Sequence, residues 1–114
     1  DDSAFMRKSL TIMLNSDPEI QVLDTARDGE DAVNKVKSLD PDVITLDIHL
    51  PDMNGVEVLK LLKKDKSSIP VIVVTSDDTV EKECKEYKAD GFVKKPINFK
   101  KLEDIIKLAV QKTS

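Results

Sequence analysis

The sequence predicts an α/β fold in which a parallel sheet is covered by helices on both faces. Short runs of β-branched residues alternate with longer segments whose apolar residues recur at helical spacing. The strand-like runs are apolar at consecutive positions, which is typical of strands that are buried on both faces. This alternation favours parallel strands that are joined by crossover helices.

The predicted helices begin at capping residues and end at proline signals. Ser3, Asp28 and Asn98 are candidate N-caps, because their side chains can accept hydrogen bonds from the first helical turn. Asp17-Pro18 and Asp40-Pro41 end the first two helices, since the residue before a proline disfavours helical backbone. The five predicted helices cover residues 3–15, 28–39, 56–64, 79–88 and the segment that follows Asn98.

Four strands are predicted between these helices. They cover Ile20–Ala26, Val43–Leu46, Val71–Val74 and Gly91–Val93, and the last ends at Lys95-Pro96. The chain shows no internal repeat, linker or low-complexity segment. Its 114 residues therefore predict a single domain over residues 1–114.

The composition excludes several classes of protein. Hydrophobic residues make up 39% and charged residues 35%, which is typical of a soluble domain. The longest uncharged apolar run, residues 69–74, is too short to cross a bilayer. One cysteine, Cys84, excludes an internal disulfide, and one histidine, His49, excludes a histidine-cluster zinc site. Without a visible secretory signal, we expect a cytoplasmic protein.

The charge is unevenly distributed along the chain. The net charge of −4 combines an acidic half, residues 1–57, with a basic half, residues 58–114. The acidic half argues against a general nucleic-acid binder, and the basic half favours an acidic protein partner or simply solvated helix faces. Only three glycines are present, and no phosphate-binding glycine motif occurs, so a nucleotide-binding fold is excluded at motif level.

Polar residues follow the predicted strands at the points where the strands end. Asp47, Thr75 and Lys95 each follow a strand, and Asp1 and Asp2 precede the first helix, where another strand end is expected. Because ligands of parallel sheets bind beyond the carboxyl ends of the strands, these side chains should meet at one edge. Clustered carboxylates need a cation, and oxygen ligands favour Mg²⁺ over zinc. A carboxylate can also accept a phosphoryl group, whose charge an ammonium group and a metal would stabilise.

These residues resemble the receiver domain of two-component response regulators, especially the chemotaxis-type receivers. The resemblance covers nearly the whole chain, and the four motifs together are far more specific than any one of them. They are Asp1-Asp2-Ser3-Ala4-Phe5-Met6-Arg7, Asp47 with Pro51 and Gly55, Val73-Val74-Thr75-Ser76, and Ala89-Asp90-Gly91-Phe92-Val93-Lys94-Lys95-Pro96. The resemblance implies a flavodoxin-like, doubly wound sheet of five parallel strands in the order 2-1-3-4-5.

The resemblance also implies a role for each site residue. Asp47 would be the phosphoacceptor, Thr75 the switch hydroxyl, Lys95 the lysine that pairs with the phosphoryl group, and Phe92 the switch aromatic. Mg²⁺ or Mn²⁺ would be held by Asp1, Asp2, Asp47 and the backbone carbonyl of His49. We interpret the His49 side chain as at most a tuner of phosphoryl lifetime, and Cys84 as an ordinary helix thiol.

The implied partners are a sensor histidine kinase as phosphodonor and an output protein or domain. The output would dock on the face made by the fourth helix, fifth strand and fifth helix, and dimerisation on phosphorylation is possible. No nucleic acid and no membrane are expected as partners of the domain itself. The chain would act on no outside substrate and would catalyse only its own phosphorylation and dephosphorylation. It would work alone, or within a methylesterase or a transcription factor.

Three departures from the family pattern stand out. The sequence starts at the acidic pair, so the family's first strand is expected to be missing from it, through trimming, deliberate truncation or supply by another chain. The stretch from Thr75 to Lys95 is about two residues short by eye, so the fourth helix or its entry loop should be short. Lys88 replaces a small residue, usually glycine, so the end of that helix is expected to be altered.

Two other hypotheses compete with the receiver. A Mg²⁺-dependent phosphatase with an aspartate nucleophile would need a second aspartate two residues on, where this chain has His49. A phosphorylation-incompetent receiver scaffold is favoured by the missing strand and disfavoured by the presence of Asp47, Thr75 and Lys95.

Overall fold

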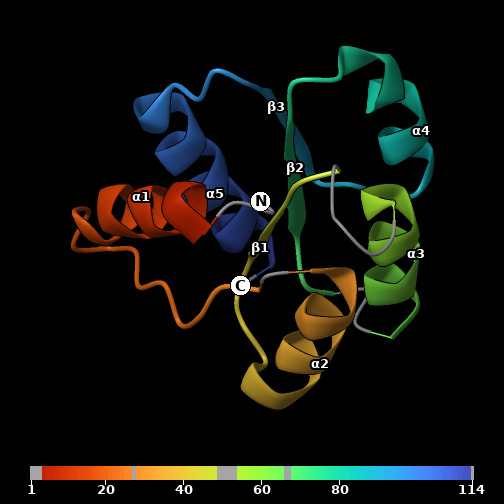
Figure 1. Cartoon of the computed structure of the whole chain (residues 1–114), viewed down its shortest axis with the longest axis horizontal. Helices are drawn as coiled ribbons and strands as arrows, with labels where there is room; N and C mark the ends of the chain where they lie inside the picture. Colours follow the sequence, from red (N-terminus) through yellow and green to blue (C-terminus); the bar gives the residue numbers. More distant parts are fainter. Residues whose placement is uncertain (1–3, 27, 49–53, 66–67, 114) are drawn as a thin grey trace.

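The computed structural model describes residues 4–26, 28–48, 54–65 and 68–113. Three parallel strands form its sheet in the order β1-β2-β3 (Figure 1). The strands are β1 Ile44–Leu46, β2 Val71–Thr75 and β3 Gly91–Lys94. The helices are α1 Ala4–Asn15, α2 Gly29–Leu39, α3 Gly55–Asp65, the 3-10 turn η1 Asp78–Val80, α4 Glu81–Glu86 and α5 Phe99–Thr113.

Helices cover both faces of this sheet. Figure 1 shows α1 and α5 on one side and α3 and α4 on the other. All five residues of β2 are buried, and the side chains of the first four alternate between two apolar clusters. Val71 and Val73 join the cluster made with α2, α3 and α4, whereas Ile72 and Val74 join the cluster made with α1 and α5. The apolar run of β2 is thus explained by burial on both faces.

The predicted caps Asp28 and Asn98 begin helices α2 and α5. The Asp28 side chain accepts the N–H of Asp31 at 2.8 Å at the start of α2, and Asn98 accepts the N–H of Lys101 at 3.1 Å at the start of α5. Asp40 ends α2 in the left-handed conformation with φ of 50°. The candidate cap Ser3 lies outside the described residues.

The helix that follows β2 is short, as the spacing predicted. The segment expected to be helical over residues 79–88 contains η1 and the six residues of α4. The N–H groups of Lys88 and Ala89 bond the carbonyls of Lys85 and Cys84, the paired bonds of a regular helix end. Lys88 adopts φ of 68° to make this turn. The helix end that was expected to be altered therefore keeps regular hydrogen bonds, and a lysine occupies a conformation that favours glycine.

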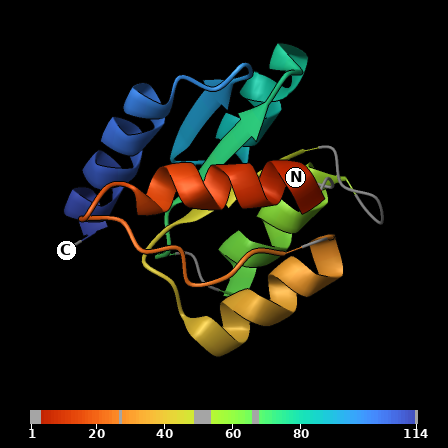
Figure 2. The ribbon, with the colours of Figure 1, turned by 60° about the vertical axis from the view of Figure 1, so that its left-hand side comes forward.

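The predicted strand Ile20–Ala26 is wrong, because this segment forms no strand in the structure. Among the described residues, β1 pairs only with β2, so no neighbouring strand is available to bond the backbone of the segment. Figure 2 shows the segment crossing from the end of α1 towards the start of α2. It is held instead by side chains: Asn15 accepts the N–H of Val22 at 2.8 Å, and the ammonium of Lys35 donates to the carbonyl of Thr25.

The three observed strands match the last three of the implied order 2-1-3-4-5. Their carboxyl ends lie at one edge of the sheet because all three are parallel. None of the described helices is both long and apolar enough to span a membrane. The edge at the carboxyl ends of the strands is therefore the place to examine for a site.

Candidate functional site

The parallel strands bring Asp47, Thr75 and Lys95 together at the carboxyl end of the sheet. Asp47 directly follows β1, Thr75 is the last residue of β2, and Lys95 directly follows β3. The ammonium of Lys95 lies 2.7 Å from Oδ2 of Asp47, across 48 positions of the sequence. The parallel pairing of β1 and β3 with β2 brings these two residues, which are far apart in sequence, to the same edge of the sheet.

The Asp47 carboxylate is the more buried member of this ion pair. Its side chain is 8% exposed, whereas that of Lys95 is 25% exposed. A carboxylate placed so deeply requires a cationic or hydrogen-bonding partner to remain charged. The ammonium of Lys95 supplies one through a short, charge-assisted bond. The arrangement places an ammonium group directly beside a buried carboxylate at the carboxyl edge of the sheet.

Thr75 is fully buried and connects β2 to Lys95. Its backbone carbonyl accepts the N–H of Lys95 at 2.9 Å, which fixes the backbone that carries the ammonium group. Its hydroxyl oxygen accepts the N–H of Asp77 at 3.2 Å. Thr75 therefore positions Lys95 through its backbone and retains a hydroxyl group beside the strand ends.

Gly55 sits against the backbone on the other side of Asp47. Its N–H donates to the carbonyl of Ile48 at 2.8 Å. A Cβ at this position would lie 2.4 Å from Cα of Ile48 and 2.5 Å from the carbonyl oxygen of Asp47. Only glycine permits this approach, which places the start of α3 directly beside the strand end.

Sequence reasoning missed two residues around the site. The side chain of Asn54 accepts the N–H of Val56 at 2.8 Å and caps α3. Asparagine immediately before an apolar helical pattern is a recognised cap signal. Asp77 accepts the N–H of Thr79 at 3.0 Å. This turn was visible in the sequence as an aspartate two residues before a threonine, and its bond to Thr75 required the structure.

The other predicted site residues fall into two groups. Asp1, Asp2 and His49 lie outside the described residues. Phe92 is half-buried in β3 and packs against the cluster that contains Cys84 of α4. Burial raises the pKa of the Cys84 thiol, which disfavours the reactive thiolate. Within the described ranges, no cluster of three histidine, cysteine, aspartate or glutamate side chains suited to a metal occurs.

Comparison with known families identifies the family of this chain. The sequence model of the response regulator receiver domain matches residues 1–107. The chain belongs to the response regulator receiver domain family. Receivers of this family serve two-component signalling, and the flavodoxin-like parallel fold predicted from the sequence is confirmed by the solved structures below.

The curated relatives include enzymes described as protein-glutamate methylesterase/protein-glutamine glutaminase. The chain is 44% identical over 115 residues to a protein-glutamate methylesterase/protein-glutamine glutaminase of Halalkalibacterium halodurans, covering 93% of this chain and 33% of the relative. It is 50% identical over 102 residues to a protein of the same description from Bacillus licheniformis, covering 84% of this chain and 28% of the relative. The chain thus spans about a third of the length of these relatives.

Solved receivers have the same fold. The response regulator domain of Thermotoga maritima CheB superposes with a TM-score of 0.84 at 35% identity, covering 99% of this chain and 90% of that chain. The chemotaxis protein CheY4 of Vibrio cholerae superposes with a TM-score of 0.85 at 27% identity, covering 96% and 92%. The chain is therefore similar both to a receiver of a methylesterase and to a chemotaxis receiver protein.

Proposed function

We propose that this receiver accepts a phosphoryl group on Asp47 from a phosphohistidine of a sensor histidine kinase. A carboxylate oxygen of Asp47 attacks phosphorus, and the bond between phosphorus and the imidazole nitrogen breaks. The electron pair of that bond stays on the imidazole, and the product on this chain is an acyl phosphate. The observation that carries the proposal is the buried Asp47 carboxylate with the Lys95 ammonium 2.7 Å away, at the carboxyl edge of a parallel sheet.

Lys95 and Thr75 would stabilise the phosphoryl group once it is transferred. Negative charge on the phosphoryl oxygens is stabilised by positive charge that is already in place before the reaction. Lys95 is held at the site at two points. Its ammonium group bonds Asp47, and its backbone N–H bonds the carbonyl of Thr75. The Thr75 hydroxyl can donate its proton to a phosphoryl oxygen while its own oxygen still accepts hydrogen bonds.

The donor chemistry of the site suits Mg²⁺ or Mn²⁺. The described part of the site offers a carboxylate oxygen and no sulfur or imidazole ligand, which favours a hard cation. Asp1, Asp2, Asp47 and the backbone carbonyl of His49 would hold it. When bound, the metal would neutralise charge on the incoming phosphoryl group.

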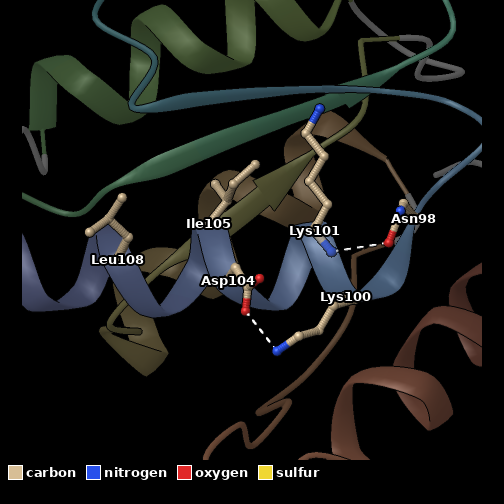
Figure 3. A pocket seen from close by; sticks show the side chains of 6 residues that line it. All are labelled: Asn98, Lys100, Lys101, Asp104, Ile105 and Leu108. Carbon is tan, nitrogen blue, oxygen red and sulfur yellow. Dashed lines mark hydrogen bonds and ion pairs between the residues drawn. The ribbon is translucent and has the colours of Figure 1, made fainter.

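The output face would be formed by α4, β3 and α5, with Phe92 at its centre. Phe92 is half-buried against the Cys84 cluster, so a change at α4 would alter its packing. A hollow of about 340 Å³ lies on α5, where the half-buried Ile105 and the exposed Leu108 are flanked by lysines and Asp104. Figure 3 shows its side chains, with Lys100 paired to Asp104. Apolar surface beside lysines suits an amphipathic partner segment that carries acidic groups.

The output controlled by this face would be a methylesterase, as in the relatives named above. The similarity to the receiver portion of those proteins supports this version over a transcription factor. A stand-alone chemotaxis receiver is the other version, supported by the similarity to CheY4. In either version residues 1–114 form the receiver unit, work in the cytoplasm, catalyse only their own phosphorylation and dephosphorylation, and bind no nucleic acid or membrane. Dimerisation on phosphorylation would be compatible with both versions.

The test is intact-mass measurement with Mg²⁺ before and after addition of a small-molecule phosphodonor such as acetyl phosphate. We expect a single phosphoryl adduct that requires Mg²⁺ and is absent from Asp47→Asn. A second sample carries Lys95→Met, for which we expect a folded chain with a strongly reduced adduct. No adduct on a folded wild-type chain would overturn the switch and leave a receiver that serves as a scaffold. Turnover of a generic phosphate ester would instead favour a phosphatase.

A further inference from the structure

The loop after β2 holds the hydroxyl group of Thr75. The N–H of Asp77 donates to Oγ of Thr75 at 3.2 Å, and Thr75 itself is fully buried. Movement of Oγ away from its present position stretches this bond unless the Asp77 backbone moves with it. The position of the hydroxyl is thus tied to the position of the loop.

The Asp77 backbone is in turn fixed by its own side chain. Oδ1 of Asp77 accepts the N–H of Thr79 at 3.0 Å and also the hydroxyl of Thr79. A carboxylate that bonds the backbone two residues ahead closes a tight local turn. This turn sets the direction of the Asp77 N–H, and so the strength of its bond to Thr75.

The same turn begins the helical segment that follows. Thr79 lies in η1, which leads directly into α4. Val80 precedes α4 and makes no side-chain cap bond. A helix of six residues is marginal by itself and depends on its ends and its packing. The Asp77–Thr79 turn therefore provides a side-chain cap for the start of this segment, one turn ahead of α4.

We propose that Asp77 is a positioning residue for Thr75. Its turn with Thr79 holds the Thr75 hydroxyl in the resting position and couples departure of that hydroxyl to loosening of the start of α4. The inference rests on the proposed function, in which the hydroxyl moves to the phosphoryl group on Asp47. It adds a physical connection between the site and α4: Thr75 hydroxyl, Asp77 N–H, Asp77 carboxylate and Thr79.

Cys84 allows a test in the resting protein, without any phosphoryl group. It is the single cysteine of the sequence, it lies in α4 and it is fully buried, so an aromatic disulfide reagent reacts with it only when α4 opens. We expect Asp77→Ala to speed this reaction about fivefold, the equivalent of one hydrogen bond. Asp77→Asn keeps the oxygen acceptor and should restore the slow rate.

Three further variants, one of them a control, distinguish positioning from general loss of stability. Thr75→Val removes the acceptor of the Asp77 N–H and should speed the reaction similarly, and the double variant with Asp77→Ala should react little faster than either single variant. Ser16→Ala is the control, because it removes a single side-chain hydrogen bond at the end of α1, from the Ser16 hydroxyl to the carbonyl of Met13 at 2.6 Å. An unchanged rate in Asp77→Ala, additive effects in the double variant, or an equal increase in Ser16→Ala would overturn the inference.

A phosphodonor arm keeps this inference separate from the proposed function. In the wild type, formation of the adduct should raise the Cys84 rate, and in Asp77→Ala the increase should be smaller because the start of α4 is already loosened. If the adduct forms and the wild-type rate does not rise, the coupling is wrong. If no adduct forms, the proposed function fails, and the resting rates of the four variants still decide whether Asp77 holds Thr75.

Discussion

The two ends of the sheet each carry a lysine–aspartate pair, and the pairs differ in what surrounds them. At the carboxyl ends, Lys95 lies 2.7 Å from Asp47, and the carboxylate is the more buried partner. At the amino ends, Lys63 lies 2.6 Å from Asp90, and there the lysine is the more buried, with 11% of its side chain exposed against 39% for Asp90. The same two residue types therefore occupy opposite environments.

The pair at the amino ends is bound to the backbone on both sides. Oδ2 of Asp90 also accepts the N–H of Val71 at 2.8 Å, and Lys63 also donates to the carbonyl of Ile69 at 3.1 Å. It joins α3, the start of β2 and the residue before β3. Because it binds backbone groups at the start of β2 and just before it, we interpret it as structural, whereas the pair at the carboxyl ends buries the carboxylate that we propose as the phosphoacceptor. The role of a lysine–aspartate pair in this fold therefore depends on its burial and on the groups that it hydrogen-bonds.

The largest effect is expected when the aspartate of each pair is replaced by asparagine, at the carboxyl ends and at the amino ends of the strands. Asp47→Asn should abolish the phosphoryl adduct, because an amide is not a nucleophile for phosphoryl transfer. Asp90→Asn should leave the adduct intact and lower the free energy of unfolding by about 1–2 kcal/mol, since it weakens a charge-assisted bond. Intact mass and urea unfolding measure the two effects. Loss of the adduct in a folded Asp90→Asn chain would contradict the division of roles.

The next largest effect is expected on the free energy of unfolding, when a glycine near either end of the strands is replaced by alanine. Gly55→Ala should cost about 3 kcal/mol of unfolding free energy, because its Cβ would meet the backbone of Ile48 at 2.4 Å. Gly91→Ala should cost only about 1 kcal/mol, since its nearest contact is a side-chain methyl group of Ile105 at 3.0 Å. Urea unfolding of the two variants checks the order. Equal costs would mean that α3 shifts away from Asp47 as readily as Ile105 shifts.

A smaller effect, an increase in the free energy of unfolding, is expected from a substitution at Lys88, two residues before Asp90. Lys88→Gly should raise the free energy of unfolding by about 1 kcal/mol, because glycine adopts the φ of 68° without steric cost. Asp40→Gly, at φ of 50° after α2, is the matched control and should gain less, since aspartate tolerates this region better than lysine. Thermal unfolding provides the measurement. A destabilised Lys88→Gly chain would show that the Lys88 side chain has a stabilising role of its own.

The smallest effect concerns a third lysine–aspartate pair, away from both strand ends. Lys107 lies 2.7 Å from Asp17 and holds the pKa of that carboxyl below its ordinary value of 3.8. A lowered pKa adds stability that is present above the ordinary value and is lost as the pH falls through the folded-state pKa. Unfolding midpoints measured from about pH 6 to about pH 3 should therefore fall more steeply in the wild type than in Asp17→Asn. Parallel curves would show that the pair contributes nothing to folding.

The sequence carried enough information for three of the strands and for the site edge. Strands β1, β2 and β3 were predicted to within one or two residues because strands buried on both faces need continuous apolar runs. Asp47, Thr75 and Lys95 could be assigned to one edge because parallel strands place their carboxyl ends together. Capping by Asp28 and Asn98 was equally local, since a cap depends on only the next three residues.

Tertiary structure decided the remainder. The segment Ile20–Ala26 has a strand-like sequence and forms no strand, because a strand exists only where a neighbour accepts its backbone hydrogen bonds. The pairing of Lys63 with Asp90 joins residues 27 positions apart, and no local pattern selects that lysine from the many others. The bond from Asp77 to Thr75 likewise required the exact course of the loop.

The alternation of apolar runs with helical segments determined which residues follow the strands at the carboxyl edge, because this alternation is a property of the chain pattern itself. Distances, burial and the choice of partner for each charge were settled only by packing, because they depend on residues brought together from distant positions. The contrast between Asp47 and Asp90 shows this division. Both aspartates flank a predicted strand, and only the fold buries one carboxylate at the site and binds the other to the backbone of β2.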